Sequence, residues 1–192
     1  NISHRLDKLQ ILHQLGLAVF IFDYRGYGRS EGRPSEQGTY EDAEAAWRYL
    51  TRDRGTPGRD IIIYGESLGA AIAARLAEHE APGALVVESA FTSITAMARH
   101  YYPYLPVTLL ARIRYPTLKY IRGVSCPVLV IHSREDEIVP MEHGRMLYQA
   151  AGDRGTFLEI SGDHNSGYYT SGSRYRGGLD AFVTRLFGAS AG

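Results

Sequence analysis

Short apolar runs alternate with helix-like segments along nearly the whole chain, and this alternation constrains the fold more than any other feature. The runs are continuously apolar, which is typical of strands buried on both faces. They span residues 17–24, 60–65, 84–89, 127–133 and 156–160. Segments with helical spacing of apolar residues lie beside them, at 2–15, 37–53, 68–80, 141–151 and 176–187. Strands that alternate with helices predict an α/β fold, with a mostly parallel sheet and helices on both faces.

Length and composition narrow the class of protein. The 192 residues predict a single domain over 1–192. Lys+Arg and Asp+Glu are equal at 21 each, which argues against a nucleic-acid partner. The single cysteine, Cys126, cannot form an internal disulfide, so a reducing compartment is compatible. No apolar run is long enough to span a bilayer and no signal-peptide pattern is present, so we expect a cytoplasmic protein, with an anchor or signal upstream of Asn1 left open.

The stretch "YGESLGAA" places one serine between two glycines, after a strand and before a helix. Gly65, Ser67 and Gly69 match G-x-S-x-G, the motif in which a strained turn lifts a nucleophilic serine above the edge of the sheet. Glycines lack a Cβ and so allow neighbouring backbone to pass close by. The backbone N–H of Leu68, at the helix start, is the predicted oxyanion donor. The alternative is a chance pentapeptide in a turn.

A nucleophilic serine needs a base, and the base needs an orienting carboxylate, which follow the serine in the order acid, then histidine. "HSREDEIVP" comes directly after the strand 127–133, and its H-x-x-x-D-x-x-V-P pattern makes Asp136 the predicted acid. The neighbouring Glu135 and Glu137 are predicted to be solvated. Glu88, at the end of the strand 84–89, is the alternative acid.

The predicted base is His164, in "GDHN" after the strand 156–160. Four other histidines follow Ser67 in the chain: His79, His100, His132 and His143. His79 and His143 lie on predicted helices and are expected to be surface or packing residues. His132 ends a strand and is expected to shape the acid loop, whereas His100 lies in an insert. No His, Cys or carboxylate cluster has metal-ligand spacing, so no metal is expected.

Six pieces, in order, carry a resemblance to a known family. They are "NISHRL" (1–6), "DYRGYGRSEG" (23–32), "GESLG" (65–69), "VVESAFTSI" (86–94), "HSREDEIVP" (132–140) and "GDHN" (162–165). Together they cover nearly the whole chain. The sequence resembles the α/β-hydrolase superfamily, and more narrowly the branch of α/β-hydrolase domain-containing proteins thirteen and seventeen, some of them protein depalmitoylases.

The resemblance implies an α/β-hydrolase fold without a required cofactor. In the family, a strand and an H-G-type loop precede the region matching Asn1, and that loop gives the second oxyanion amide. The resemblance therefore predicts that the N-terminal strands and half of the oxyanion hole lie outside the visible chain, and the absence of one oxyanion donor typically costs about 10²–10³ in rate. Ser133 stands where many members have glycine, which should only adjust the loop.

Residues 92–122 interrupt the alternation and are predicted to form a cap over the active site. Aromatic and aliphatic residues there, with one tyrosine after the base, are the predicted substrate-binding residues: Tyr101, Tyr102, Leu105, Leu109 and Tyr168. Five Lys or Arg residues and no acid give the segment a positive charge that favours contact with an anionic membrane surface. The alternative is an ordinary cap with solvated arginines.

The glycine-rich "RGYGRSEG" also invites a nucleotide-binding interpretation. Gly26, Gly28 and Gly32 are spaced one residue too long for the dinucleotide fingerprint, and the next helix starts too late to hold a pyrophosphate. A loop-shaping role, braced by Asp23 and Arg25, is predicted instead.

The sequence thus predicts a serine hydrolase that cleaves a carboxylic ester or thioester of a small or lipid-like molecule through Ser67, Asp136 and His164. A peptidase or an acyltransferase on the same fold, and a non-catalytic binding module, stay as alternatives. The pattern leaves the oligomeric state open.

Overall fold

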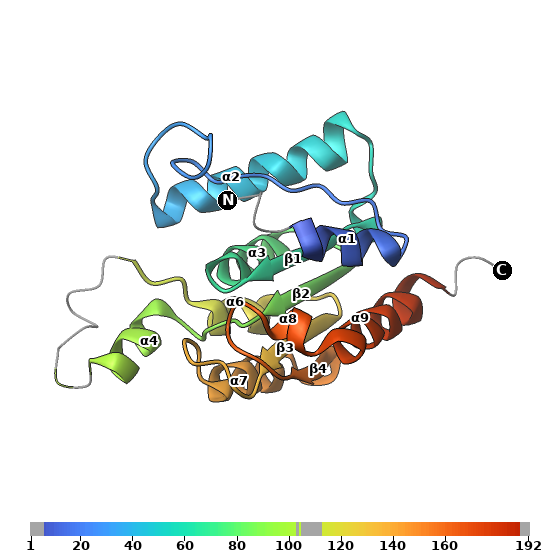
Figure 1. Cartoon of the computed structure of the whole chain (residues 1–192). Helices are drawn as coiled ribbons and strands as arrows, with labels where there is room; N and C mark the ends of the chain where they lie inside the picture. Colours follow the sequence, from blue (N-terminus) through green and yellow to red (C-terminus); the bar gives the residue numbers. More distant parts are fainter. Residues whose placement is uncertain (1–5, 103, 105–112, 189–192) are drawn as a thin grey trace.

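The computed structural model describes residues 6–102, 104 and 113–188. Its centre is a four-stranded sheet in which every neighbouring pair is parallel and the strands follow one another in chain order (Figure 1). The strands are β1 (Ile62–Glu66), β2 (Ala84–Glu88), β3 (Val128–Ser133) and β4 (Gly155–Ile160). The predicted parallel α/β architecture is confirmed.

The two central strands explain why the runs of apolar residues had no period of two. Every residue of β2 and of β3 is buried, because helices cover both faces of the sheet. The register pairs Glu66 with Glu88 and Ser133 with Ile160, at the carboxyl ends of their strands. These ends therefore meet at one edge of the sheet, which is where ligands bind in open parallel sheets.

Two groups of helices cover the two faces. On one face α2 (Glu36–Arg48), α3 (Leu68–His79), α6 (Thr117–Gly123) and α7 (Met141–Ala151) enclose the larger core, which includes Trp47, Ile72 and Leu147. On the other face α1 (Leu6–Gln14) and α9 (Gly172–Phe187) enclose a smaller core around Ile11, Tyr175 and Leu179. The shorter elements are α4 (Ile94–Tyr101), α8 (Gly167–Thr170), the 3₁₀ turns Gly58–Asp60 and Gly152–Arg154, and a π-helical turn at Tyr49–Asp53 that continues α2.

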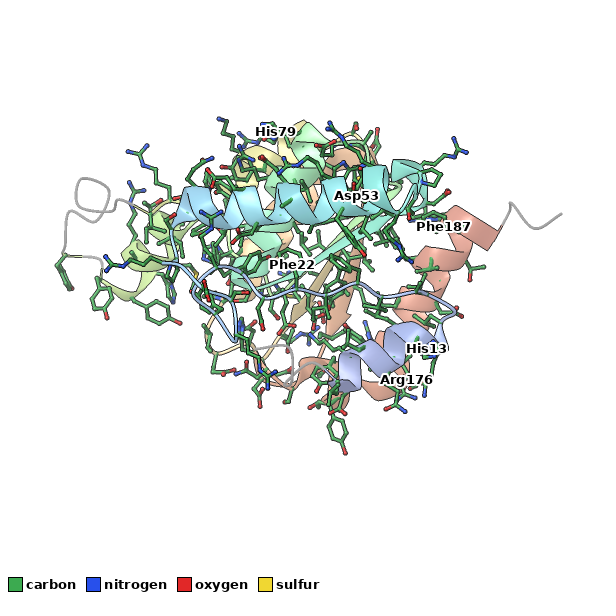
Figure 2. The ribbon with its side chains drawn as sticks, turned by 90° about the horizontal axis from the view of Figure 1, so that it is seen from above. His13, Phe22, Asp53, His79, Arg176 and Phe187 are labelled. Atoms are coloured by element: carbon green, nitrogen blue, oxygen red, sulfur yellow. The ribbon has the colours of Figure 1, made fainter. Side chains whose placement is uncertain are left out.

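The predicted strand over 17–24 is wrong. Residues 17–24 form no strand, and the side chains of Val19, Phe20 and Ile21 are more than a third exposed. The segment runs beside α2, where Figure 2 shows Phe22. A groove of about 750 Å³, lined by Phe20, Ile62 and other residues, separates it from the outer edge of β1. Since a strand exists only by hydrogen bonding to a neighbour, this run without a partner among the described residues stays irregular.

The second half of the predicted cap belongs to the main body. Tyr120 and Ile121 of α6 are buried in the larger core, and Tyr115 before them donates or accepts a hydrogen bond of 2.9 Å with Thr39 of α2. A capping role for the rest of 92–122 stays a prediction, and the proposed basic membrane contact stays one too.

The glycine-rich loop is braced as the sequence indicated. The guanidinium of Arg25 donates to Asp42 of α2 at 2.8 and 3.0 Å, and its backbone N–H donates to the same carboxylate at 2.8 Å. Gly28 has φ of 56°, and a Cβ on it would lie 2.1 Å from the Asp23 carboxylate. Close packing and a left-handed backbone therefore account for the glycine. None of the described helices has the length and apolar character needed to cross a membrane.

Candidate active site

Ser67 is the single residue between a strand and a helix. β1 ends at Glu66, α3 begins at Leu68, and the serine between them has φ of 53° and ψ of −118°. This is a strained conformation for a residue with a Cβ, and such strain gathers at functional sites. The backbone N–H of Ser67 donates to the Glu88 carbonyl oxygen at 2.9 Å, which ties the turn to β2. The side chain is thereby presented at the carboxyl edge of the sheet.

The two glycines of the motif, Gly65 and Gly69, have different space around them. A Cβ on Gly65 would lie 2.3 Å from the Gly69 carbonyl oxygen, so β1 and α3 approach too closely for any side chain there. A Cβ on Gly69 would meet only the Tyr24 hydroxyl, at 3.9 Å. The expected close backbone approach therefore applies to Gly65 and not to Gly69.

His164 and Asp136 are brought to Ser67 by two other loops. His164 follows β4, and its Nε2 lies 3.2 Å from Ser67 Oγ. Asp136 follows β3, and its two carboxylate oxygens lie 2.9 and 2.8 Å from His164 Nδ1. Because a carboxylate only accepts hydrogen bonds, Nδ1 carries the ring proton and Nε2 is free to accept from the serine hydroxyl. The His164 side chain is 7% exposed and the Asp136 side chain is fully buried, so the chain of hydrogen bonds is largely shielded from water.

The interaction between Asp136 and His164 shifts the pKa of each group toward its charged form. Burial raises the pKa of Asp136, but the hydrogen bonds from His164, Val139 and Ile138 outweigh burial, so the net pKa lies below the ordinary value. Burial lowers the pKa of His164, but the hydrogen bond and charge of Asp136 outweigh it, so the net pKa lies above the ordinary value. Asp136 is therefore ionised at neutral pH, and it favours a positive charge on the imidazole ring.

The acid loop is fixed from within. One Asp136 oxygen accepts the backbone N–H groups of Val139 at 2.7 Å and Ile138 at 3.0 Å. The fully buried His132 donates from Nε2 to the Val139 carbonyl oxygen at 2.8 Å. Burial is the main cause that lowers the pKa of His132 and keeps its ring neutral. His132 thus shapes the loop, as its place at the strand end suggested.

Glu135 and Glu137 hold the histidine loop, which the sequence analysis missed. The Glu137 carboxylate accepts the backbone N–H of His164 at 3.0 Å, and that of Glu135 accepts the N–H of Gly162 at 3.0 Å. Ser133 also joins the loops, because its hydroxyl donates to the Gly162 carbonyl oxygen. Both glutamates are exposed, yet they link the two loops that carry His164 and Asp136. The only sequence signal was three consecutive acids, which usually means a solvated loop.

Replacing Glu137 by alanine removes the acceptor of the His164 N–H and should therefore misplace His164. We expect kcat/KM for an ester substrate to fall about tenfold, the typical cost of losing one hydrogen bond to a charged group. Steady-state kinetics beside Glu142→Ala, which replaces an exposed glutamate in the first turn of α7, measures this. Equal kcat/KM in the two variants would contradict the positioning role.

The remaining predicted residues are placed as follows. Leu68 is the first residue of α3, so its N–H belongs to a helix N-terminus, where such groups lack intrahelical partners. Tyr101 and Tyr102 are about half exposed, and the Tyr101 hydroxyl donates to the Ile138 carbonyl oxygen of the acid loop at 2.7 Å. Tyr168 packs against Tyr175 on the α1–α9 face. Leu105 and Leu109 lie outside the described residues.

The carboxylate of the alternative acid, Glu88, and the side chains of His79 and His143 make hydrogen bonds away from Ser67. The Glu88 carboxylate accepts from the Tyr175 hydroxyl at 2.8 Å and makes no contact with His164 that would replace Asp136. His143 bonds Thr92, His79 bonds its own helix, and Figure 2 shows His79 at the periphery of the molecule. Burial raises the pKa of the Cys126 thiol to about 11, which leaves it unreactive. Among the described residues, no group of three His, Cys, Asp or Glu is arranged to hold a metal ion.

Comparisons with known sequences place the chain in a family. A family model described as "Serine aminopeptidase, S33" matches residues 7–123. An uncharacterised protein of Mycobacterium tuberculosis is 40% identical over 183 residues, which are 95% of this chain and 65% of that protein. The α/β-hydrolase domain-containing protein WAV2 of Arabidopsis thaliana is 36% identical over 195 residues, with 91% of this chain and 63% of that protein covered.

A further relative carries a substrate in its name. Lysophosphatidylserine lipase ABHD12 of Danio rerio is 34% identical over 167 residues, which are 78% of this chain and 43% of that protein. The chain spans less than two thirds of the length of each of these relatives. The finer placement near α/β-hydrolase domain-containing proteins thirteen and seventeen stays a prediction.

Solved structures share the architecture. An esterase of Pyrococcus furiosus has a TM-score of 0.77 at 21% identity, with 95% of this chain and 75% of that chain covered, a likeness that shows the fold. The esterase domain of a Rhodothermus marinus protein has a TM-score of 0.65 at 25% identity, with 100% and 80% covered. The family model, the relatives and the common fold together show that this chain belongs to the α/β-hydrolase superfamily.

Proposed function

We propose that the protein is a serine hydrolase that cleaves carboxylic ester or thioester bonds, with Ser67 as nucleophile, His164 as base and Asp136 as orienting acid. One observation carries the proposal. Hydrogen bonds run without a break from Ser67 Oγ through the His164 ring to the Asp136 carboxylate. This order of nucleophile, base and carboxylate is recognised by geometry and roles across unrelated folds.

In the acylation step, Ser67 Oγ attacks the acyl carbon while its proton passes to His164 Nε2. The negative charge of the carbonyl oxygen in the tetrahedral intermediate faces the N-terminus of α3, where the Leu68 N–H donates to it. The intermediate then collapses, the bond from carbon to the leaving oxygen or sulfur breaks, and Nε2 returns the proton to the leaving group. Asp136 stabilises the imidazolium throughout and does not itself become protonated.

In the deacylation step, water takes the place of the leaving group. His164 Nε2 removes a proton from water as the water oxygen attacks the acyl carbon of the acyl-enzyme. The ester bond to Ser67 Oγ breaks, and the proton on Nε2 returns to the serine hydroxyl. Acid, alcohol or thiol, and free enzyme are the products, and the protein's own side chains carry out every proton transfer.

The relatives support a lipid-like ester as the substrate class. One is named as a lysophosphatidylserine lipase, and two solved structures of the same fold are esterases. A peptidase is the second candidate, because the matching family model is described as a serine aminopeptidase. Both reactions use the same three side chains, so the leaving group distinguishes them. An acyltransferase differs only in the acceptor that attacks the acyl-enzyme.

The test of the nucleophile is covalent labelling of the full-length natural protein by a fluorophosphonate probe. We expect one adduct by intact-mass spectrometry, located at Ser67 by fragmentation of its peptide. A folded protein that takes no adduct, or takes it on another serine, would overturn the proposal.

The test of the substrate is a matched series of p-nitrophenyl esters, thioesters and amino-acid anilides. We expect turnover of esters or thioesters, with kcat/KM rising as the acyl chain is lengthened. Preferential anilide cleavage would establish the peptidase instead. An alcohol added to the reaction reveals an acyltransferase by its new ester.

A further inference from the structure

Two buried carboxylates and one buried ammonium lie directly behind the nucleophile, on the α1–α9 face of the sheet. Lys8 of α1 is 6% exposed, and it is one of two lysines in the sequence. Its Nζ donates to Glu66 at 2.5 Å and to Glu88 at 2.8 Å. These carboxylates end β1 and β2, and the two residues face each other in the register.

Two tyrosines complete the cluster. Tyr64 and Tyr175 both donate their hydroxyl groups to the Glu88 carboxylate. Burial first, and then the charge of Glu88, raise the pKa of both tyrosines, which keeps them neutral donors. We call Lys8, Tyr64, Glu66, Glu88 and Tyr175 the Lys8 cluster. Tyr168 of α8 covers it from outside, with its ring centre 4.9 Å from Lys8 Nζ.

The Lys8 cluster is joined to Ser67 at two points. Glu66 directly precedes Ser67 in the chain. The hydrogen bond from Lys8 to the Glu66 carboxylate therefore holds the end of β1, next to the nucleophile, in place. The Glu88 carbonyl oxygen accepts the Ser67 N–H at 2.9 Å. The ammonium of Lys8 therefore holds both residues that support the strained serine.

Stability alone is a poor reason for such a cluster. Burying charges costs several kcal/mol per ion, and apolar residues of similar volume often serve as well or better. A cluster that keeps three charges in the interior beside a nucleophile points to a role in the reaction. We propose that Lys8 is a positioning residue that fixes Ser67 through Glu66 and Glu88, and that Glu66 adds negative charge which favours the imidazolium form of His164. The inference rests on the proposed function and deepens it.

Glu66 is the chain neighbour of Ser67, whose Oγ lies 3.2 Å from His164 Nε2, so the charge of Glu66 acts close to the imidazole ring. The ionisable groups whose charges act on the His164 ring are Asp136 and Glu137 of the acid loop, Glu66 of β1, His132 of β3 and the neighbouring Asp163. Behind Glu66 lies the opposing charge of Lys8. Removing the Glu66 charge should lower the pKa of His164, whereas removing the Lys8 charge should raise it, because Glu66 and Glu88 then act without compensation.

The experiment follows the rate of fluorophosphonate labelling of Ser67 across pH in full-length protein. Its variants are Glu66→Gln, Lys8→Met, the double variant and Lys119→Met, which removes the other, exposed lysine. The acid limb of the wild-type profile reports the His164 pKa. We expect this limb to move to lower pH in Glu66→Gln and to higher pH in Lys8→Met. We also expect the plateau rate to fall about tenfold in Lys8→Met.

The double variant still lacks the Lys8 ammonium that holds Glu88, so its plateau rate should stay as low as that of Lys8→Met, while its acid limb should lie at lower pH than that of Lys8→Met. Thermal unfolding of each variant identifies loss of fold. If Lys8→Met does not fold, Glu66→Gln still tests the inference, and an unmoved acid limb in that variant overturns it. Limbs and plateaus equal to those of Lys119→Met overturn it as well. An unlabelled wild-type protein overturns the proposed function, and the inference with it, before any variant is compared.

Discussion

Replacing Ser67 by alanine is expected to lower ester turnover by about 10⁶-fold, the size of effect seen when one member of such a triad is removed. The attacking oxygen is lost, while the helix N-terminus and the other two side chains stay in place. The variant should keep its fold, because the Ser67 N–H to Glu88 hydrogen bond is made by the backbone. Steady-state kinetics with the best ester of the substrate series, together with circular dichroism, measure both quantities.

The matched control for this variant is Ser125→Ala. Ser125 is exposed and precedes β3, at the opposite end of the sheet from Ser67. Its variant should retain wild-type turnover. Undiminished turnover in a folded Ser67→Ala protein would assign the reaction to another group and overturn the role of Ser67 as the nucleophile.

Replacing Asp136 by asparagine is expected to lower kcat by about 10³–10⁴-fold without large structural change. The amide is nearly the same size as the carboxylate, but its nitrogen can donate to His164 Nδ1. That donation places the ring proton on Nε2, where it blocks acceptance from the Ser67 hydroxyl 3.2 Å away. The removal of the buried negative charge also withdraws the main support of the imidazolium.

The control for Asp136→Asn is Asp153→Asn, an exposed position in the 3₁₀ turn before β4. Fluorophosphonate labelling distinguishes this mechanism from misfolding, because the Asp136→Asn protein should still react, only slowly. A loss of kcat no larger than that of Asp153→Asn would show that another carboxylate orients the base. Glu88 would then be the first group to examine.

Local patterns predicted Ser67, Asp136 and His164 as the candidate site because each follows an apolar run that could be recognised on its own. The order of strands then brings the three loops to one edge of the sheet, which is why residues far apart in the chain lie within hydrogen-bonding distance. The same kind of pattern failed at 17–24. That run is as apolar as β2, but a strand also needs a neighbouring strand to pair with. A local pattern of apolar residues cannot show whether such a neighbour exists.

Other features depended on contacts that a linear sequence hides. Glu137 was interpreted as solvated because its partner is a backbone N–H on a different loop, 27 residues away. Gly69 was interpreted as a close-approach glycine by symmetry with Gly65, although only Gly65 meets opposing backbone. The charge of Lys8 gave no sign of burial, since lysine is among the residues that are rarely buried unless they are paired.

The left-handed backbone of Ser67 has a consequence for how this chain can change over evolution. The conformation costs about 1–3 kcal/mol with a side chain present, and glycine would release most of that cost. A mutation to glycine at this one position would therefore make the fold more robust while it ends the proposed chemistry. Selection for stability alone would favour glycine at position 67, whereas selection for the proposed hydrolysis requires serine. A serine retained at position 67 in a lineage is therefore itself a sign that the proposed reaction is still used.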